Sequence, residues 1–131
     1  MKIKNKIYYF LPAVLYCALI FFLSSKSLKI HLHFIYWDKG AHWIEFLVLG
    51  FLLAIGFFHN FPGATFLNIY LTFMTGIFIG LTDELHQKFV PGRQCDWKDW
   101  IADIIGILTG LIIYLVFEKQ KYQKNEKQRE K

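Results

Sequence analysis

The chain has 131 residues, of which 55% are hydrophobic and 19% aromatic, and its formal net charge is +5. A soluble domain of this size could not bury so much apolar surface, because small domains have a high ratio of surface to volume. The basic residues gather beside apolar runs, which excludes a nucleic-acid-binding surface and indicates membrane spans in a single domain.

Residues 7–25 form the first candidate span and carry no charge over 19 residues. A helix of that length covers about 28 Å of a hydrocarbon layer that is about 30 Å thick. A cleaved signal peptide is the alternative, but the apolar core of a signal peptide has about 7–15 residues. We therefore expect a membrane helix here.

Residues 46–82 contain no Asp, Glu, Lys or Arg over 37 residues, and residues 59–63 interrupt them with turn-forming Asn, Pro and Gly. This pattern predicts two spans joined by a short hairpin. Residues 101–117 form a fourth span. The expected fold is all-α, a polytopic membrane protein with a bundle of four transmembrane helices in residues 1–117 and a charged cytoplasmic tail in residues 118–131.

The distribution of basic residues predicts the orientation of the bundle. Nine Lys and Arg residues lie on the side of the two termini, and six lie in the other two loops. Positive residues favour the cytoplasmic side, so both termini are expected there. The four tryptophans then lie at the outer edge, as in an interfacial aromatic belt; they are Trp37, Trp43, Trp97 and Trp100.

Two spans are too short unless they draw polar residues into the membrane. Residues 46–58 and 104–117 would cover only about 20 Å and 21 Å. The second helix must therefore begin near Lys39, which brings His42 and Glu45 to the apolar layer. The fourth helix must begin near residues 96–100, which brings Asp103 inward. Ionisable groups at such depth usually face a protein interior or a water-filled cavity.

Helical spacing places the polar residues of three spans on single helix faces. The three sets are Asp38, His42, Glu45 and Leu49; Gly76, Gly80, Glu84 and Gln87; and Asp99, Asp103, Gly106 and Gly110. The two Gly-x-x-x-Gly pairs allow close approach of helix backbones. The three faces are therefore expected to converge on one polar pocket just below the outer surface.

The residues of the second helix have alternative roles. Asp38 is either a helix cap or a helix cap that also belongs to the site. His42 is expected to be a hydrogen-bonded partner of Asp38 or Glu45 rather than a metal ligand. The spacing of His42, Glu45, Glu84 and His86 permits a divalent metal, but such spacing is common, and no metal ligand is assigned.

The third loop supplies the remaining candidates. Asp96 is expected to cap the fourth helix with Asp99 as its N3 partner. Asp103 lies too deep for a cap, so it either pairs with Lys39 or Arg93 or stays protonated. Arg93 follows a tight Val-Pro-Gly turn, and its planar guanidinium suits either a lipid phosphate or an internal Arg–Asp ion pair.

The polar residues also form two ordered motifs. The first is Asp38-Lys39-x-x-His42, which opens an apolar helix carrying Glu45 and Gly50. The second reads Glu84-x-x-Gln87-x-Phe89-x-Pro91-Gly92-Arg93-x-x-Asp96-x-x-Asp99-x-x-x-Asp103-x-x-Gly106-x-x-x-Gly110. With this combination over residues 7–117, the chain resembles the VanZ-like family of bacterial membrane proteins, in which the position of Asp103 often carries Asn.

The resemblance implies a small multi-pass protein of the bacterial inner (cytoplasmic) membrane. The named member of the family is associated with raised resistance to teicoplanin, a lipidated glycopeptide. No reaction is firmly assigned to the family, so the resemblance supplies a context and no mechanism.

The expected function is binding or modification of an anionic lipid or lipid-linked cell-envelope molecule at the extracytoplasmic face. The catalytic candidates are His42, Glu45 and Glu84. The ligand-binding candidates are Asp38, Lys39, Gln87, Arg93, Asp96, Asp99 and Asp103. No cofactor is assigned, and the expected partners are a membrane lipid or envelope precursor and, in a homo-oligomer, further copies of the chain. The alternatives are a structural or partner-docking module and an ion- or proton-coupled transporter, although no acidic residue lies in the cytoplasmic half of the spans to form a relay.

Overall fold

The computed structural model describes residues 6–26 and 35–129, and side chains of the second helix from residue 39 onward. The elements are the 3-10 helix η1 (Lys6–Phe10) and the helices α1 (Leu11–Ser24), α2 (Ile35–Asn60), α3 (Thr65–Gln87) and α4 (Trp97–Arg129). No strand occurs in these described ranges. The prediction of an all-α chain with four long helices is confirmed.

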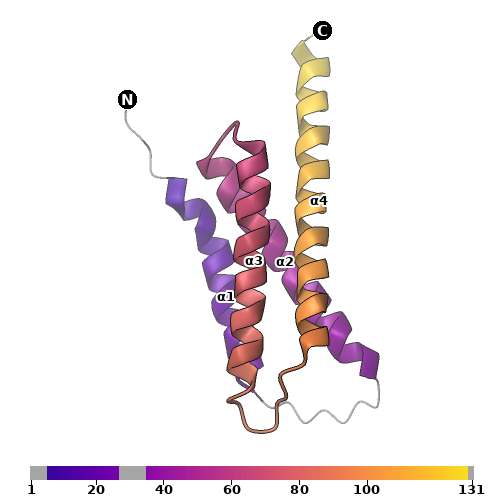
Figure 1. Ribbon diagram of the computed structural model, residues 1–131. Coiled ribbons are helices and arrows are strands. Elements are labelled where there is room, and N and C mark those ends of the chain that lie inside the picture. Colours follow the sequence, from indigo (N-terminus) through magenta and orange to yellow (C-terminus); the bar gives the residue numbers. More distant parts are fainter. Residues whose placement is uncertain (1–5, 27–34, 130–131) are drawn as a thin grey trace.

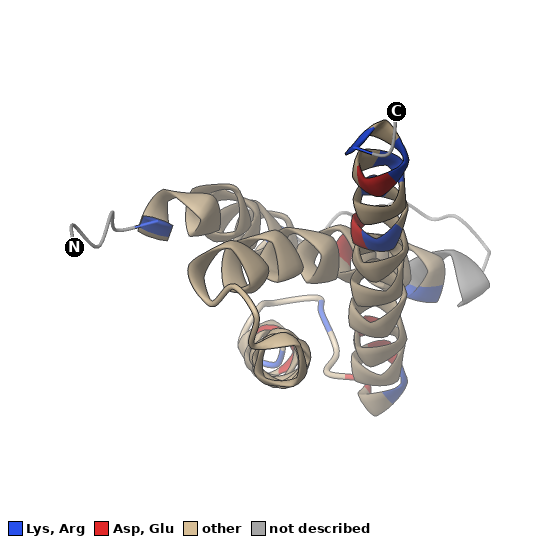
Figure 2. Ribbon diagram, turned by 90° about the horizontal axis from the view of Figure 1, so that it is seen from above, with Lys and Arg blue, Asp and Glu red and all other residues tan. Residues whose placement is uncertain are grey.

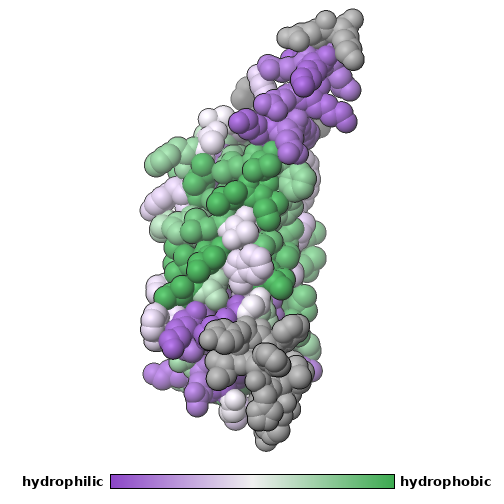
Figure 3. Space-filling view, turned by 90° about the vertical axis from the view of Figure 1, so that its right-hand side faces the viewer, coloured by the Kyte–Doolittle hydropathy of each residue, from purple (hydrophilic) through white to green (hydrophobic). Residues whose placement is uncertain are grey.

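Each of the four helical segments is long and apolar enough to cross a membrane. The space-filling view shows a hydrophobic band between two hydrophilic ends (Figure 3). Large apolar side chains of the helices are widely exposed, for example Phe66 at 85% and Phe78 at 65%. Such a surface is stable only in an apolar solvent, because water would penalise every exposed ring. The chain is therefore a multi-pass membrane protein.

The helices alternate in direction, so Lys6 and Arg129 lie at the same end of the bundle (Figure 1). The opposite end, where α1 and α3 finish and α2 and α4 begin, is called the loop end below.

Gly92 adopts a positive φ of 84° in the turn between α3 and α4, a conformation that residues with a Cβ disfavour. Charged residues of α4 lie toward its two ends and leave its middle uncharged (Figure 2).

Helices α2 and α4 make the closest contact in the bundle, and glycines on both helices allow it. A Cβ at Gly106 would lie 2.5 Å from the carbonyl oxygen of Trp43, and one at Gly50 would lie 2.6 Å from that of Ile107. A Cβ at Gly110 would likewise meet the Leu47 carbonyl oxygen. The predicted role of the Gly106–Gly110 pair in helix packing is confirmed.

Helix α3 buries its polar face and exposes its apolar face, which is the opposite of a helix on the surface of a soluble protein. Every buried residue of α3 is small or polar, and these are Asn68, Thr72, Gly76, Gly80, Asp83, Glu84 and Gln87. Gly80 brings α3 close to α4, since a Cβ there would lie 3.2 Å from Asp103 Oδ2. The apolar face of α3 is left for lipid, and its polar face is held against α2 and α4.

Candidate functional site

The deepest contact of the site joins α2 to α4. His42 Nδ1 lies 2.9 Å from Asp103 Oδ1, and only 5% of His42 and 1% of Asp103 is exposed. From the sequence, His42 is expected to pair with Asp38 or Glu45, and Asp103 either to pair with Lys39 or Arg93 or to stay protonated. In the structure His42 and Asp103 contact each other, because the Gly106 contact brings α4 against the face of α2 that carries His42. The Asp38 side chain lies outside the described residues.

Lys39 lies one turn before His42 and makes the second link between α2 and α4. Its ammonium donates to Asp99 Oδ1 at 2.8 Å and to Asp96 Oδ2 at 3.4 Å. The Asp99 side chain is only 6% exposed, whereas that of Asp96 is 39% exposed. The ion pair with Asp99 is therefore the better shielded and the stronger of the two.

Asp96 is the N-cap of α4, as predicted. Its Oδ1 accepts the Lys98 backbone N–H at 2.9 Å. This N–H and, to a smaller extent, the Lys39 ammonium hold the pKa of Asp96 below its ordinary value of 3.8, because both favour the carboxylate. The expected reciprocal bond from Asp99 is replaced: the Asp96 N–H donates to Glu84 Oε2 of α3 at 3.0 Å. A side chain from another helix thus completes the cap, while Asp99 is engaged by Lys39.

Glu84 and its neighbours bring α3 into the same group. Glu84 is 2% exposed, and its Oε1 lies 4.0 Å from His42 Nδ1. One turn along, the Gln87 amide donates to Asp83 Oδ2 at 2.9 Å, and both residues are buried. We define the polar cluster as the residues that make these contacts: Lys39, His42, Asp83, Glu84, Gln87, Asp96, Asp99 and Asp103.

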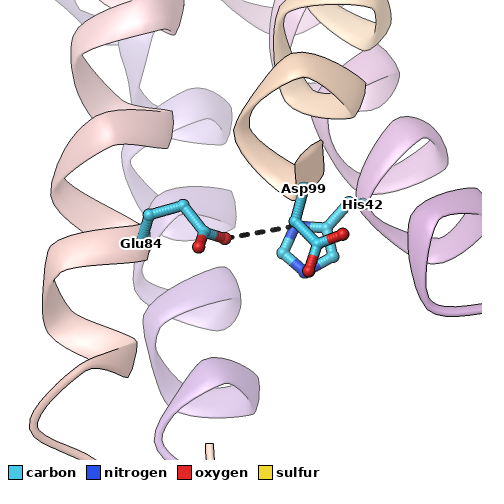
Figure 4. Close-up of side chains that lie close together, drawn as sticks. All are labelled: His42, Glu84 and Asp99. Carbon is cyan, nitrogen blue, oxygen red and sulfur yellow. Dashed lines mark ion pairs between the residues drawn. The ribbon is translucent and has the colours of Figure 1, made fainter. Parts of the chain in front are cut away.

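Three members of the polar cluster form an arrangement that suits a metal ion. One nitrogen or oxygen atom from each of His42, Glu84 and Asp99 lies within 4.8 Å of the corresponding atoms of the other two. The three side chains come from α2, α3 and α4 and are drawn together in Figure 4. An imidazole and two carboxylates are ligands for divalent metal ions.

Glu45 and Arg93, two other candidates from the sequence, are not among the residues that define the polar cluster. Glu45 is half-buried, takes part in an interaction of its own, and lies within electrostatic range of Tyr16 in α1. Arg93 donates to the Lys26 carbonyl oxygen at 3.3 Å and makes no ion pair with any residue the structure describes. The Asp38 side chain falls outside the described part of the chain.

Three further residues, Asp83, Asn68 and Thr72, are at most 1% exposed and are not among the candidates predicted from the sequence. Asn68 and Thr72 extend the Gly76-x-x-x-Gly80 face backward in steps of four, so the same periodicity could have found them. Asp83 precedes Glu84 and lies four residues before Gln87, its hydrogen-bond partner. That spacing was visible in the sequence, but the burial of both residues depends on the packing of α3.

Comparison with known proteins gives one family and one curated relative. The model of the VanZ/LLP1 family matches residues 4–118. An uncharacterized fission-yeast protein, C11E3.10, is 30% identical over 93 residues, which are 70% of this chain and 55% of the yeast protein. The chain thus aligns with about half the length of this relative, and a yeast relative gives no support to the bacterial part of the prediction. No solved structure matches the chain.

Proposed function

The chain belongs to the VanZ/LLP1 family, and we propose that it binds the anionic headgroup of a lipid or lipid-linked envelope molecule at the loop end. The support is a set of basic side chains at the loop end that make no ion pair with any residue the structure describes. Arg93 is half-buried, and three lysines at the same end of the bundle are exposed; they are Lys26, Lys88 and Lys98. None of these four makes an ion pair within the described residues.

Arg93 is the central residue of this proposal. The turn that precedes it holds the backbone in place, and its guanidinium already donates to the Lys26 carbonyl oxygen at the end of α1. A guanidinium fixed in this way retains further N–H groups for a phosphate or carboxylate. The internal Arg–Asp ion pair, which was the competing interpretation, does not occur among the described residues, so the charge of Arg93 remains available to an anion.

Should the bound molecule be modified, His42 and Glu84 are the candidates for proton transfer. They lie 4.0 Å apart in a buried environment and come from different helices. A buried imidazole and a carboxylate near it are suited to general acid and base roles. Glu45 would act from the α1 side of the same region, and Lys39 and Asp99 would hold the arrangement rigid.

Tryptophan quenching by brominated lipids tests the binding step. Trp97 and Trp100 belong to the first turn of α4, and Trp43 belongs to the third turn of α2, so their quenching reports on the loop end of the bundle and not on the basic tail. In vesicles that mix brominated phosphatidylglycerol with phosphatidylcholine, we expect the anionic lipid to be enriched near these residues. Each basic residue near an anionic headgroup contributes about 1 kcal/mol, so Arg93→Gln is expected to lower the enrichment about fivefold.

The matched control is Lys124→Gln, which removes one positive charge from the tail at the other end of α4 and should leave the quenching unchanged. Glu45→Ala and Glu84→Ala test the polar residues in the same assay, with insertion verified for each. Equal quenching by brominated phosphatidylglycerol and phosphatidylcholine would refute the proposal. So would unchanged lipid enrichment and an unchanged envelope phenotype in the Arg93, Glu45 and Glu84 variants.

A second candidate function is structural, and the contacts between helices favour it. Lys39–Asp99 and His42–Asp103 join α2 to α4, and Glu84 joins α3 to the first turn of α4. A module that only holds the bundle or docks a partner would lose stability or assembly on substitution of these residues. Its lipid enrichment in the quenching assay would stay the same, which separates the two functions.

The finer assignments are also proposals. We propose that the chain comprises the bundle in residues 1–117 and a cytoplasmic tail in residues 118–131, in a bacterial inner membrane. The basic residues beside both termini support this orientation. A link to glycopeptide tolerance is the corresponding proposal at the level of the family, and susceptibility to teicoplanin with and without the gene tests it.

A further inference from the structure

The geometry of three buried side chains points to a site that the proposed function does not require. His42, Glu84 and Asp99 project from three different helices toward one point at the loop end (Figure 4). Their candidate ligand atoms lie within 4.8 Å of one another. Two ligands about 2.0–2.2 Å from one ion are at most about 4.4 Å apart. Inward movement of about half an ångström would therefore suffice to place all three around one ion.

Three carboxylate oxygens in the polar cluster accept no hydrogen bond from any residue that the structure describes. They are Glu84 Oε1, Asp103 Oδ2 and Asp83 Oδ1, and all three are buried. The first of them faces His42, at 4.0 Å from Nδ1. A buried acceptor without a donor costs free energy comparable to a lost hydrogen bond, and a charged one costs more. A positively charged group bound to Glu84 Oε1 would remove this cost. The neighbouring imidazole and carboxylates are suited to binding a metal cation in that position.

The polar cluster also has an excess of negative charge, which favours a cation. Four carboxylates are buried, namely Asp83, Glu84, Asp99 and Asp103. Within the described residues, two cationic side chains contact them: Lys39 forms an ion pair with Asp99, and His42 with Asp103. With every group charged, the polar cluster, which also contains Asp96, holds three more negative charges than positive ones. A charge excess is expensive within a membrane protein, and a divalent ion would reduce it.

We propose that His42, Glu84 and Asp99 bind one divalent transition-metal ion of the series from Mn²⁺ to Zn²⁺. An imidazole together with carboxylates favours these ions over Ca²⁺ and Mg²⁺, which prefer oxygen ligands alone. Asp103 is placed to orient the His42 ring, as carboxylates behind metal-bound histidines commonly do. Asp96 and Lys39, which are 39% and 30% exposed at the side chain, lie at the border through which an ion would enter.

The biological role of this ion rests on the proposed headgroup site. A cation held by the polar cluster would counter the repulsion between its carboxylates and an anionic headgroup. Binding of the ion itself needs no lipid, and it is measured without one. A chain that retains the ion but does not enrich anionic lipid would refute the headgroup proposal alone. A chain that enriches anionic lipid but retains no ion would refute the metal proposal alone.

The test uses the full chain, without a histidine tag, purified in a neutral detergent and stripped with a chelator. The protein is incubated with Mn²⁺ or Zn²⁺ singly, desalted, and analysed by elemental mass spectrometry, with Ca²⁺ and Mg²⁺ as comparison ions. We expect about one Mn²⁺ or Zn²⁺ per chain. Glu84→Gln and Asp99→Asn each remove one charged ligand and are expected to weaken binding about tenfold or more.

Two substitutions outside the cluster serve as controls. His59→Gln removes another histidine of α2, whose Nδ1 is hydrogen-bonded to the Ile55 carbonyl oxygen. Glu118→Gln removes a carboxylate at the far end of α4. Both variants should retain the ion. If a site variant fails to fold, the melting temperature of the parent chain still provides the test: Zn²⁺ or Mn²⁺ should raise it, and chelation should reverse the rise.

Two results would overturn the proposal. One is a parent chain that neither retains Mn²⁺ or Zn²⁺ nor gains thermal stability from them. The other is equal retention by the parent, Glu84→Gln and Asp99→Asn, because the ion would then lie elsewhere on the chain.

Discussion

Replacing Gly106 with alanine should separate α2 from α4. The new Cβ would lie 2.5 Å from the Trp43 carbonyl oxygen, whereas ordinary contact begins at 3.4 Å, so the helices must part locally by about 0.9 Å. A gap of about 0.5–1 Å removes about a quarter to a half of the dispersion attraction between the atoms it separates. Overpacking of this kind costs about 1–3 kcal/mol. Alanine recovers about 1 kcal/mol through its helix propensity, which leaves a net loss of about 0–2 kcal/mol.

Gly40→Ala is the matched control for this prediction. Gly40 also lies in a helix, but a Cβ there would meet nothing within 4 Å, so the substitution should stabilise the chain by about 0.4–1 kcal/mol. Free energies of unfolding from denaturant titration in detergent, followed by circular dichroism, should differ between the two variants by about 0.4–3 kcal/mol. Equal stability of Gly106→Ala and Gly40→Ala would refute the close packing of α2 on α4.

Three further predictions follow from the site. Leucine at either His42 or Asp103 should cost about 3–5 kcal/mol. Leucine at both should cost less than the sum, because neither residue is then left buried without the other; strictly additive unfolding free energies would contradict this pairing. The folded-state pKa of Asp96 is below its ordinary value of 3.8, so its stabilising effect should be complete above that pH and be lost as pH falls through the folded-state pKa; Asp96→Asn should abolish this acid sensitivity in thermal melts. In a Cys17→Ser background, an impermeant maleimide should label the exposed Cys95 on intact cells if the loop end faces outward; labelling only after permeabilisation would reverse the orientation. Loss of hydration and the nearby Glu84 raise the pKa of the Cys95 thiol, so this labelling should be faster at alkaline pH.

The sequence was sufficient to predict the four spans and the end at which the polar residues gather. Span length did most of this, because an apolar run of 13 or 14 residues must recruit its polar neighbours to cross a bilayer. The periodicity of glycines also identified the packing face of α4, with Gly106 against Trp43. These signals depend on distances along a single helix, which the sequence fixes.

The pairing within the site was not predictable in the same way. Lys39, His42 and Asp103 were all expected near one another, but which acid pairs with which base depends on the rotation of α4 about its axis. A rotation of one residue changes the direction of a side chain by about 100°. Packing at Gly106 sets that rotation, so that Asp103 pairs with His42 and Asp99 pairs with Lys39. The spacing of polar residues along a helix shows which residues share a face, but it does not show which residues of another helix that face contacts.

The reversed polarity of α3 constrains how the protein is made. The chain leaves the ribosome in order, so α3 enters the bilayer while its polar face still lacks α4. At that stage Glu84 has no Asp96 amide to accept from, and His42 of α2 has no Asp103. The nascent protein must keep these groups in the translocation machinery, in water or in protonated form until the last span arrives. A chain that stops before Trp97 would leave its unmatched polar residues facing lipid, and we expect the cell to degrade it.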